Sequence, residues 1–142
     1  MNTKLIVLAL ISLLWVGFAA EAEQKSTLGP WDVHYIVFGT TFLTPEVAKA
    51  NNIVRSKYNA LVNISVLDSE SQAAQRVSIS GTARNLVGNT KELSFKRVIE
   101  GESIYYLAQL SFRDQETFRF KIDIQQGNEQ QTLTFQQKMF TD

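Results

Sequence analysis

Few side chains in this sequence of 142 residues could perform chemistry. It contains one histidine, His34, and no cysteine, and its two methionines are Met1 and Met139. A copper site needs soft donors such as His, Met or Cys, and a zinc or catalytic site needs several suitable groups to converge. We therefore interpret His34 as an ordinary strand residue and Met139 as part of the core. We predict no catalytic residues, no metal ligands and no cofactor.

Two close pairs of acidic residues could in principle supply a general acid and a general base. The pairs are Glu100 with Glu102 and Asp114 with Glu116. Both fall in predicted hairpin turns, whereas glycoside hydrolysis needs two carboxyl groups facing each other across a cleft. Neither a G-x-S-x-G nucleophile motif nor a glycine-rich phosphate loop is present. The sequence therefore predicts a protein that is not an enzyme.

Most of the chain alternates between apolar and polar residues, which is typical of strands with one buried face. Turn-forming Gly, Asn, Asp and Ser residues separate seven such segments: 31–39, 59–66, 76–84, 92–99, 104–112, 118–124 and 132–140. The segment 92–99 loses its alternation near Arg97 and Val98, which predicts a bulge or a strand end. We predict an all-β fold, a seven-stranded antiparallel immunoglobulin-like or fibronectin-like β-sandwich. A small β-barrel is the alternative.

One stretch between the first two strands, TTFLTPEVAKANNIVRSK at 40–57, interrupts this pattern. Thr44 is a suitable N-cap and Pro45 suits the first helical position, while the two asparagines at 51–52 suit a helix exit. One short helical turn is therefore predicted at 45–50. It must dock on the sandwich, because so short a helix is not stable alone. The first strand is apolar on both faces, so either this turn or a partner covers its second face.

The N-terminal residues are typical of a secretory signal peptide. Lys4 precedes an apolar run at 5–19, and Ala20-Glu21-Ala22 offers the small residues that signal peptidase recognises. We predict cleavage after Ala22 and a periplasmic protein, with 23–142 as a single β-sandwich domain. The apolar run is shorter than the roughly 20 residues of a spanning helix. No membrane span is therefore expected after cleavage, and a retained anchor is the alternative.

Charge and surface pattern point to the class of partner. The sequence has 14 basic and 14 acidic residues, so it lacks the basic excess of a nucleic-acid-binding protein. We predict binding to another envelope protein or to a second copy of the chain. The predicted contact surface lies around the helical turn: Phe42, Leu43, Lys49, Arg55 and Lys57. The alternative is a periplasmic carrier of a small ligand or metal, with a pocket between the sheets and polar groups such as Tyr35, Asn63 or Tyr105 pointing in.

Three segments carry a resemblance to a known family. They are VHYIVFGTTF, TTFLTPEVAKANNIVRSKYNALVNISV and the terminal FRFKIDIQQGNEQQTLTFQQKMF. Together they resemble the small exported bacterial proteins grouped as domain-of-unknown-function family 4426, over most of 23–142. The resemblance implies a periplasmic β-sandwich, and it brings no activity and no catalytic residue. With the absence of catalytic groupings, it predicts a non-catalytic periplasmic module.

Overall fold

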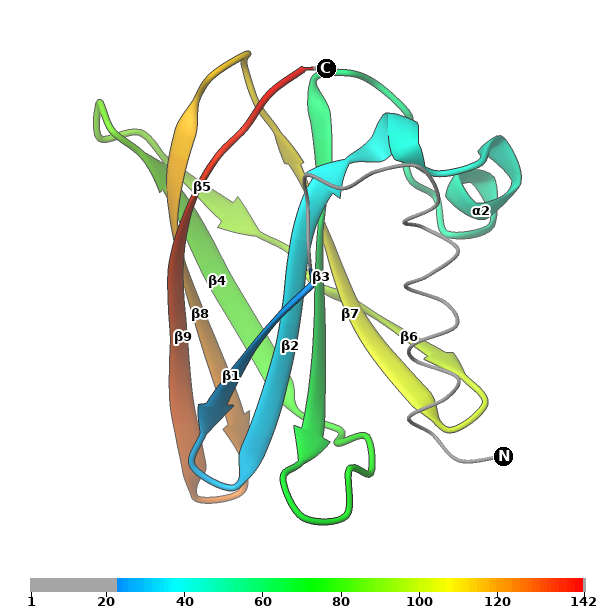
Figure 1. Cartoon of the computed structure of the whole chain (residues 1–142), viewed down its shortest axis with the longest axis vertical. Helices are drawn as coiled ribbons and strands as arrows, with labels where there is room; N and C mark the ends of the chain where they lie inside the picture. Colours follow the sequence, from blue (N-terminus) through cyan, green and yellow to red (C-terminus); the bar gives the residue numbers. More distant parts are fainter. Residues whose placement is uncertain (1–22, 142) are drawn as a thin grey trace.

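The computed structural model describes residues 23–141, and the predicted signal peptide, 1–22, lies outside the described residues. The elements are β1 (Gln24–Leu28), β2 (Trp31–Gly39), the 3-10 helix η1 (Thr40–Phe42), α2 (Pro45–Ala50), β3 (Asn59–Asp68), β4 (Ser78–Asn85), β5 (Thr90–Leu93), β6 (Lys96–Glu100), β7 (Ser103–Ser111), β8 (Thr117–Gln126) and β9 (Glu129–Lys138) (Figure 1). Within 23–141, no helix has the length and apolar character needed to cross a membrane.

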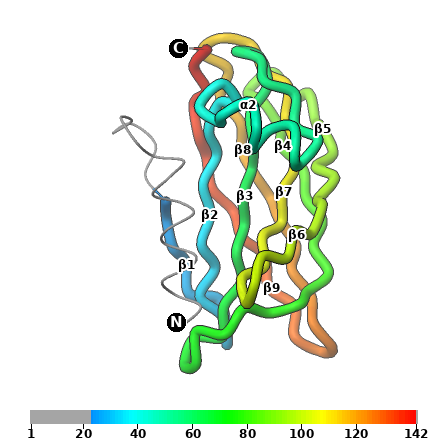
Figure 2. Tube along the Cα trace, turned by 90° about the vertical axis from the view of Figure 1, so that its right-hand side faces the viewer, coloured from blue at the N-terminus to red at the C-terminus, as the bar shows by residue number. Residues whose placement is uncertain are grey.

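The strands form two facing antiparallel sheets, which lie side by side in Figure 1, while Figure 2 shows the five-stranded sheet toward the viewer. The five-stranded sheet has the order β1-β2-β3-β7-β6, and the four-stranded sheet has the order β5-β4-β8-β9. The runs β2-β3-β7-β6 and β4-β8-β9 correspond to the ABED and CFG sheets of an immunoglobulin constant domain. Strand β1 is added beside β2, and β5 is added beside β4. The predicted immunoglobulin-like β-sandwich is confirmed.

Residues 23–141 form nine strands where seven were predicted, and each difference has its own reason. Strand β1 has the sequence QKSTL, which is short, largely exposed and polar at an edge, so it carries no apolar alternation. The segment 92–99 is two strands, because β5 ends at Leu93 in one sheet and β6 begins at Lys96 in the other. The alternation of this segment shifts phase because Leu93 faces the interior, whereas Val98 lies on the outer face of the five-stranded sheet.

The core lies between the two sheets and consists of the inward residues of every long strand. Alternate residues of β3 and β8 are fully buried against each other: Val62, Ile64, Val66, Phe118, Phe120, Ile122 and Ile124. Burying one such side chain stabilises the fold by about 1.5–3 kcal/mol. Rings from both sheets also stack, with centroids 4.5 Å apart for Tyr35 and Phe135 and 4.6 Å apart for Phe120 and Phe135. Packing of this kind holds the described residues without disulfides.

The short helix α2 forms as predicted and covers part of the outer face of the five-stranded sheet. The Thr44 hydroxyl accepts a hydrogen bond from Val47 N at 3.2 Å, and Asn52 adopts a positive φ of 56° after the helix. Buried side chains then form a second cluster on that face: Ile36, Phe38, Leu43, Ala48, Ile53 and Leu61. Of the two alternatives for the second face of the first long strand, the turn is the one that covers this part of it.

Candidate functional site

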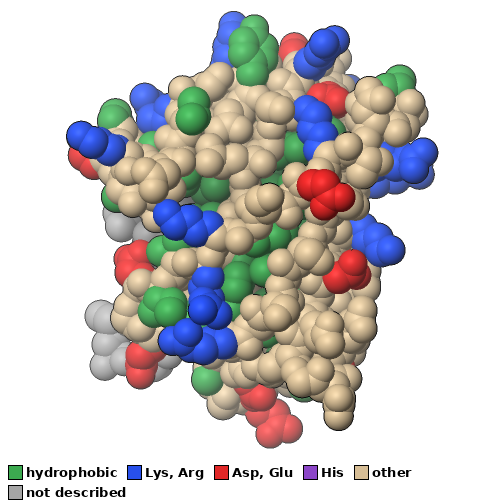
Figure 3. Space-filling view, turned by 180° about the vertical axis from the view of Figure 1, so that it is seen from behind, with side chains coloured by type: hydrophobic (Ala, Val, Ile, Leu, Met, Phe, Trp, Pro, Cys, Tyr) green, Lys and Arg blue, Asp and Glu red, His purple; other side chains and the backbone are tan. Residues whose placement is uncertain are grey.

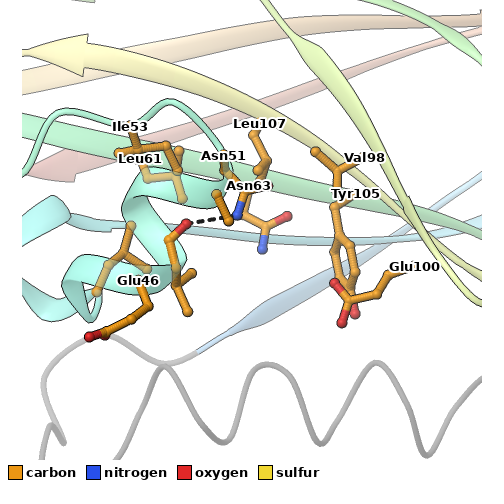
Figure 4. Close-up of a pocket in the computed structure, with 12 residues that line it drawn as sticks. Glu46, Asn51, Ile53, Leu61, Asn63, Val98, Glu100, Tyr105 and Leu107 are labelled. Atoms are coloured by element: carbon orange, nitrogen blue, oxygen red, sulfur yellow. Dashed lines mark hydrogen bonds between the residues drawn. The ribbon is translucent and has the colours of Figure 1, made fainter.

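A pocket of about 320 Å³ lies on the outer face of the five-stranded sheet, beside α2 (Figure 4). Apolar side chains make most of its wall: Leu43, Val47, Ala50, Ile53, Leu61, Val98 and Leu107. Five polar side chains complete it: Glu46, Asn51, Asn63, Glu100 and Tyr105. Ligand pockets are typically apolar with a few placed polar groups, so this pocket has the composition of a binding site.

Strand register and the helix together position these residues. Asn63 of β3 pairs with Leu107 of β7, so their side chains share the outer face. Tyr105, two residues before Leu107, shares that face and pairs with Val98 of β6. The helix side is closed by α2, whose last turn is secured by a 2.9 Å hydrogen bond from Asn51 Nδ2 to Val47 O, the dashed line in Figure 4.

The outer face also holds buried polar atoms that lack partners. Within residues 23–141, five buried side-chain atoms make no hydrogen bond: Glu23 Oε1, His34 Nε2, Asn63 Oδ1, Ser103 Oγ and Tyr105 Oη. Of these atoms, Glu23 Oε1 lies 2.9 Å from His34 Nδ1. None lies between the sheets. Native proteins leave few such groups unsatisfied. Their concentration on the outer face therefore makes that face a candidate binding surface.

The electrostatics of the pocket come from carboxylates and one phenol. Burial, with added repulsion from the charges of Glu100 and Glu23, raises the pKa of Tyr105 above its usual value, and the nearby Ser103 hydroxyl only partly opposes this. Tyr105 therefore keeps its proton at neutral pH and can donate it, although no hydrogen bond of standard geometry joins it to Ser103. Glu46 and Glu100 lie at opposite ends of the pocket (Figure 4).

A second surface lies at the end of the sandwich that carries α2 and the C-terminus, which we call the loop end. Its loops are 40–58, 86–89, 112–116 and 139–141 (Figure 1). Five of the six exposed large hydrophobic side chains in residues 23–141 belong to these loops: Val54 (65%), Tyr58 (51%), Leu86 (65%), Val87 (82%) and Phe140 (52%). The sixth, Ile99, lies on β6. Figure 3 shows hydrophobic side chains projecting at this upper end beside Lys and Arg side chains.

The five predicted contact residues lie at the loop end, but they have different surroundings. Leu43 is 2% exposed and forms part of the pocket wall. Phe42 is half-buried and packs against the second hydrophobic cluster. Lys49 and Lys57 are exposed, and Lys57 Nζ lies 5.2 Å from the ring centroid of Tyr58.

The fifth residue, Arg55, forms hydrogen bonds to the backbone of its own chain. Its Nε donates to Leu43 O at 2.8 Å, and its Nη2 donates to Thr41 O at 3.3 Å. Arg55 therefore fixes the loop that precedes α2, which the sequence alone did not indicate. A role of these five residues in partner contact stays a prediction.

The sequence interpretation of the pocket placed it between the sheets, whereas the structure has it on an outer face. Asn63 and Tyr105 line it, but Tyr35 does not, because its ring stacks on Phe135 in the interior. In the sequence, the feature that pointed to an outer-face pocket was the apolar second face of β2 and β3. Ile36 and Leu61, residues of that face, pack under α2 and leave the neighbouring part of the sheet accessible.

The remaining candidate residues lie either in the core or in hydrogen-bonded loops. Met139 is 3% exposed in the main core. Glu116 accepts hydrogen bonds from Asn85 Nδ2 at 2.8 Å and Arg113 N at 2.9 Å, and Asp114 accepts one from Thr141 N at 3.0 Å. These carboxylates therefore order the loops around them. Within residues 23–141, no three His, Cys, Asp or Glu side chains group closely enough to hold a metal ion.

Two kinds of protein are among the solved structures that are similar to this chain. A protein of domain-of-unknown-function family 4426 from Pseudomonas aeruginosa PAO1 is 36% identical, with a TM-score of 0.74, covering 84% of this chain and 96% of that one. FetP from uropathogenic Escherichia coli strain F11 is 12% identical. Its copper-bound variant has a TM-score of 0.61 and covers 84% of this chain and 95% of its own.

FetP as isolated from the periplasm of an expression strain gives a similar result. Its TM-score is 0.62, and it covers 87% of this chain and 98% of its own. At 12% identity, this likeness concerns the fold alone. No protein of curated function matches the chain in sequence. The model of the family described as "Domain of unknown function (DUF4426)" matches residues 25–142, so this chain belongs to the DUF4426 family.

Proposed function

We propose that this chain is a non-catalytic module that acts in the periplasm after export and binds another envelope protein through its loop end. The observation that carries the proposal is the concentration of exposed hydrophobic side chains there. An isolated exposed hydrophobic residue is ordinary, but a cluster on adjoining loops is typical of an interaction site. The signal-peptide pattern of residues 1–22 supports export.

The side chains at the loop end also suit protein recognition in kind. Tyr58 and Phe140 are aromatic, and aromatic residues are enriched at the centres of protein interfaces. Lys57 and Lys138 lie over these rings, 5.2 Å and 5.6 Å from the centroids. Also at the loop end, an open depression of about 530 Å³ is lined by Leu86 and Val87, among others. A partner with an apolar contact and an acidic margin would fit this surface.

Copper carriage, suggested by the copper-bound form of FetP, is not supported by the donors in this chain. Soft metal sites use His, Met or Cys. The sequence has one histidine and no cysteine, and Met139, the only methionine after the signal segment, is buried between the sheets. The ligand-carrier alternative instead draws support from the apolar pocket beside α2, which suits an organic ligand.

In-cell photocrosslinking tests the protein-binding proposal. A photoreactive amino acid replaces Tyr58, Val87 or Phe140 in turn, and Ile99 serves as the matched control because it is an exposed hydrophobic residue away from the loop end. We expect one common adduct from the three loop positions and none from Ile99, identified by mass spectrometry. Peptides of this chain alone in the adduct would identify the partner as a second copy. Uncrosslinked monomer at every position, or equal crosslinking from Ile99, would contradict the proposal.

A further inference from the structure

We infer that the pocket beside α2 is a binding site for a small amphipathic amine, a molecule with an aliphatic body and an ammonium group. This inference concerns a different surface from the loop end and does not depend on the proposed protein partner. It rests on three features of the pocket: its apolar walls, its unpaired buried polar atoms and its acidic ends.

The apolar walls fit a hydrocarbon group of limited size. At about 320 Å³, the pocket is near the lower limit of ligand sites, which span roughly 300–1,000 Å³. Its wall combines Val47 and Ile53 from the α2 region with Leu61, Val98 and Leu107 from three neighbouring strands. Water filling such a space would gain few hydrogen bonds from these walls. An aliphatic group would instead remove apolar surface from water.

Two polar atoms inside the pocket make no hydrogen bond of standard geometry with the described residues. Asn63 is 5% exposed and Tyr105 is 1% exposed, and neither Asn63 Oδ1 nor Tyr105 Oη makes a hydrogen bond. The amide oxygen accepts hydrogen bonds, and the phenol can donate or accept. Leaving such a group buried and unpaired is unfavourable, so a ligand with N–H donors would satisfy both.

The charges at the pocket favour a cation. Glu46 and Glu100 lie at opposite ends, and no Lys, Arg or His is among the described residues that line the pocket (Figure 4). The ring of Tyr105 adds an aromatic face, which attracts cations. A carboxylate or phosphate ligand would be repelled by both glutamates, whereas an ammonium group would be attracted by them. The arrangement therefore selects an ammonium group over an anion on the same apolar body.

Three probes of equal chain length separate these contributions: hexylammonium, hexanol and hexanoate. Each is titrated into the purified protein while backbone amide chemical shifts are followed by NMR. Hexylammonium should shift the amides of Val47, Asn63 and Leu107 and bind at least threefold more tightly than hexanol. Hexanoate should bind more weakly than both. Binding of hexanoate as tight as that of hexylammonium would overturn the inference, as would an absence of shifts at these three residues.

Variants of Glu46 and Glu100, the acidic residues at the two ends of the pocket, test the contribution of charge. Glu46→Gln and Glu100→Gln should each weaken hexylammonium binding by roughly two- to fivefold, as expected for exposed charge pairs, and leave hexanol binding unchanged. The control is Glu92→Gln, because Glu92 is exposed on β5 and does not line the pocket. Equal effects of the Glu92 variant and the two pocket variants would show general charge attraction and would overturn the site.

Discussion

Tyr105 and Tyr106 are neighbours on β7 whose side chains point to opposite faces of the sheet. Tyr106 extends toward the interior, where its hydroxyl accepts a hydrogen bond from Val77 N at 2.9 Å and donates one to Gln75 O at 3.0 Å. It thereby joins β7 to the chain that leads into β4. Tyr105 lies on the outer face and its hydroxyl has no such partner. The two phenols are similarly buried, but only the Tyr106 hydroxyl forms hydrogen bonds that join parts of the fold.

Removing the two hydroxyls should have different effects on stability. Tyr106→Phe leaves the Val77 N–H and the Gln75 carbonyl without their partner, so we expect a loss of about 1–3 kcal/mol in the free energy of unfolding. Tyr105→Phe removes an unpaired group, so we expect no loss and a gain of up to about 1 kcal/mol. Urea denaturation of both variants and the parent measures this. A Tyr105 variant as destabilised as the Tyr106 variant would show that the Tyr105 hydroxyl has a stabilising partner.

At the scale of elements, the connection between β3 and β4 is organised by one carboxylate. Asp68 Oδ1 accepts hydrogen bonds from Ser71 N at 2.9 Å and Glu70 N at 3.0 Å. These backbone bonds lower the pKa of Asp68 below its ordinary value, outweighing the opposing effect of burial. The loop geometry is a typical Asx arrangement, in which an aspartate side chain replaces a backbone acceptor.

This lowered pKa predicts a dependence of stability on pH. A carboxyl whose pKa is lower in the folded state contributes stability that is complete above its unfolded value of about 3.9 and is lost as pH falls through the folded value. Asp68→Asn keeps an acceptor but cannot ionise. The stability advantage of the parent over this variant should therefore be largest near neutral pH and should decrease below about pH 4.

Urea denaturation at several pH values between 7 and 2.5 measures the difference. Glu70→Gln is the control, because it removes a carboxylate from the same loop whose side chain accepts no hydrogen bond among the described residues. A parent advantage over the Asp68 variant that stays constant down to pH 2.5 would mean that the ionised carboxylate does not stabilise this loop.

At the scale of the whole molecule, the sandwich combines a dense core with an apolar surface at one end. Phe120 is 1% exposed and stacks on Phe135, whereas Phe140 is 52% exposed on the loop end. Two phenylalanines in one chain thus serve as probes of two different regions. We expect the core around Phe120 to contribute to stability and the loop end around Phe140 to contact the partner.

Truncating the two rings should separate these roles. Phe120→Ala leaves a cavity in the core and should lower the free energy of unfolding by about 3–5 kcal/mol. Phe140→Ala should change it by less than about 0.5 kcal/mol while reducing the yield of crosslinked partner from Val87. Thermal and urea unfolding measure the first effect, and the in-cell crosslinking assay measures the second. An unchanged crosslink yield in the Phe140 variant would exclude this ring from the contact.

Much of the fold was predictable because its signals are local. Alternation of apolar and polar residues requires only neighbouring positions, so it located the long strands. The cap formed by Thr44, the position of Pro45 and the exit at Asn52 are likewise fixed within one turn, so α2 matched its predicted bounds, 45–50. Local chemistry of this kind is contained in the sequence itself.

Only the tertiary structure determined the features that depend on where strands meet. Leu93 and Val98 lie five residues apart but belong to different sheets, which no local pattern specifies. The pocket likewise requires β3, β7, β6 and α2 to come together from positions 43 to 107 of the chain. Alternation shows that Tyr105 and Tyr106 face opposite ways, but pairing partners distant in sequence determine which of them is satisfied. Burial and hydrogen bonding are properties of the assembled sheets, and for that reason the sequence predicted the sandwich without locating its pocket.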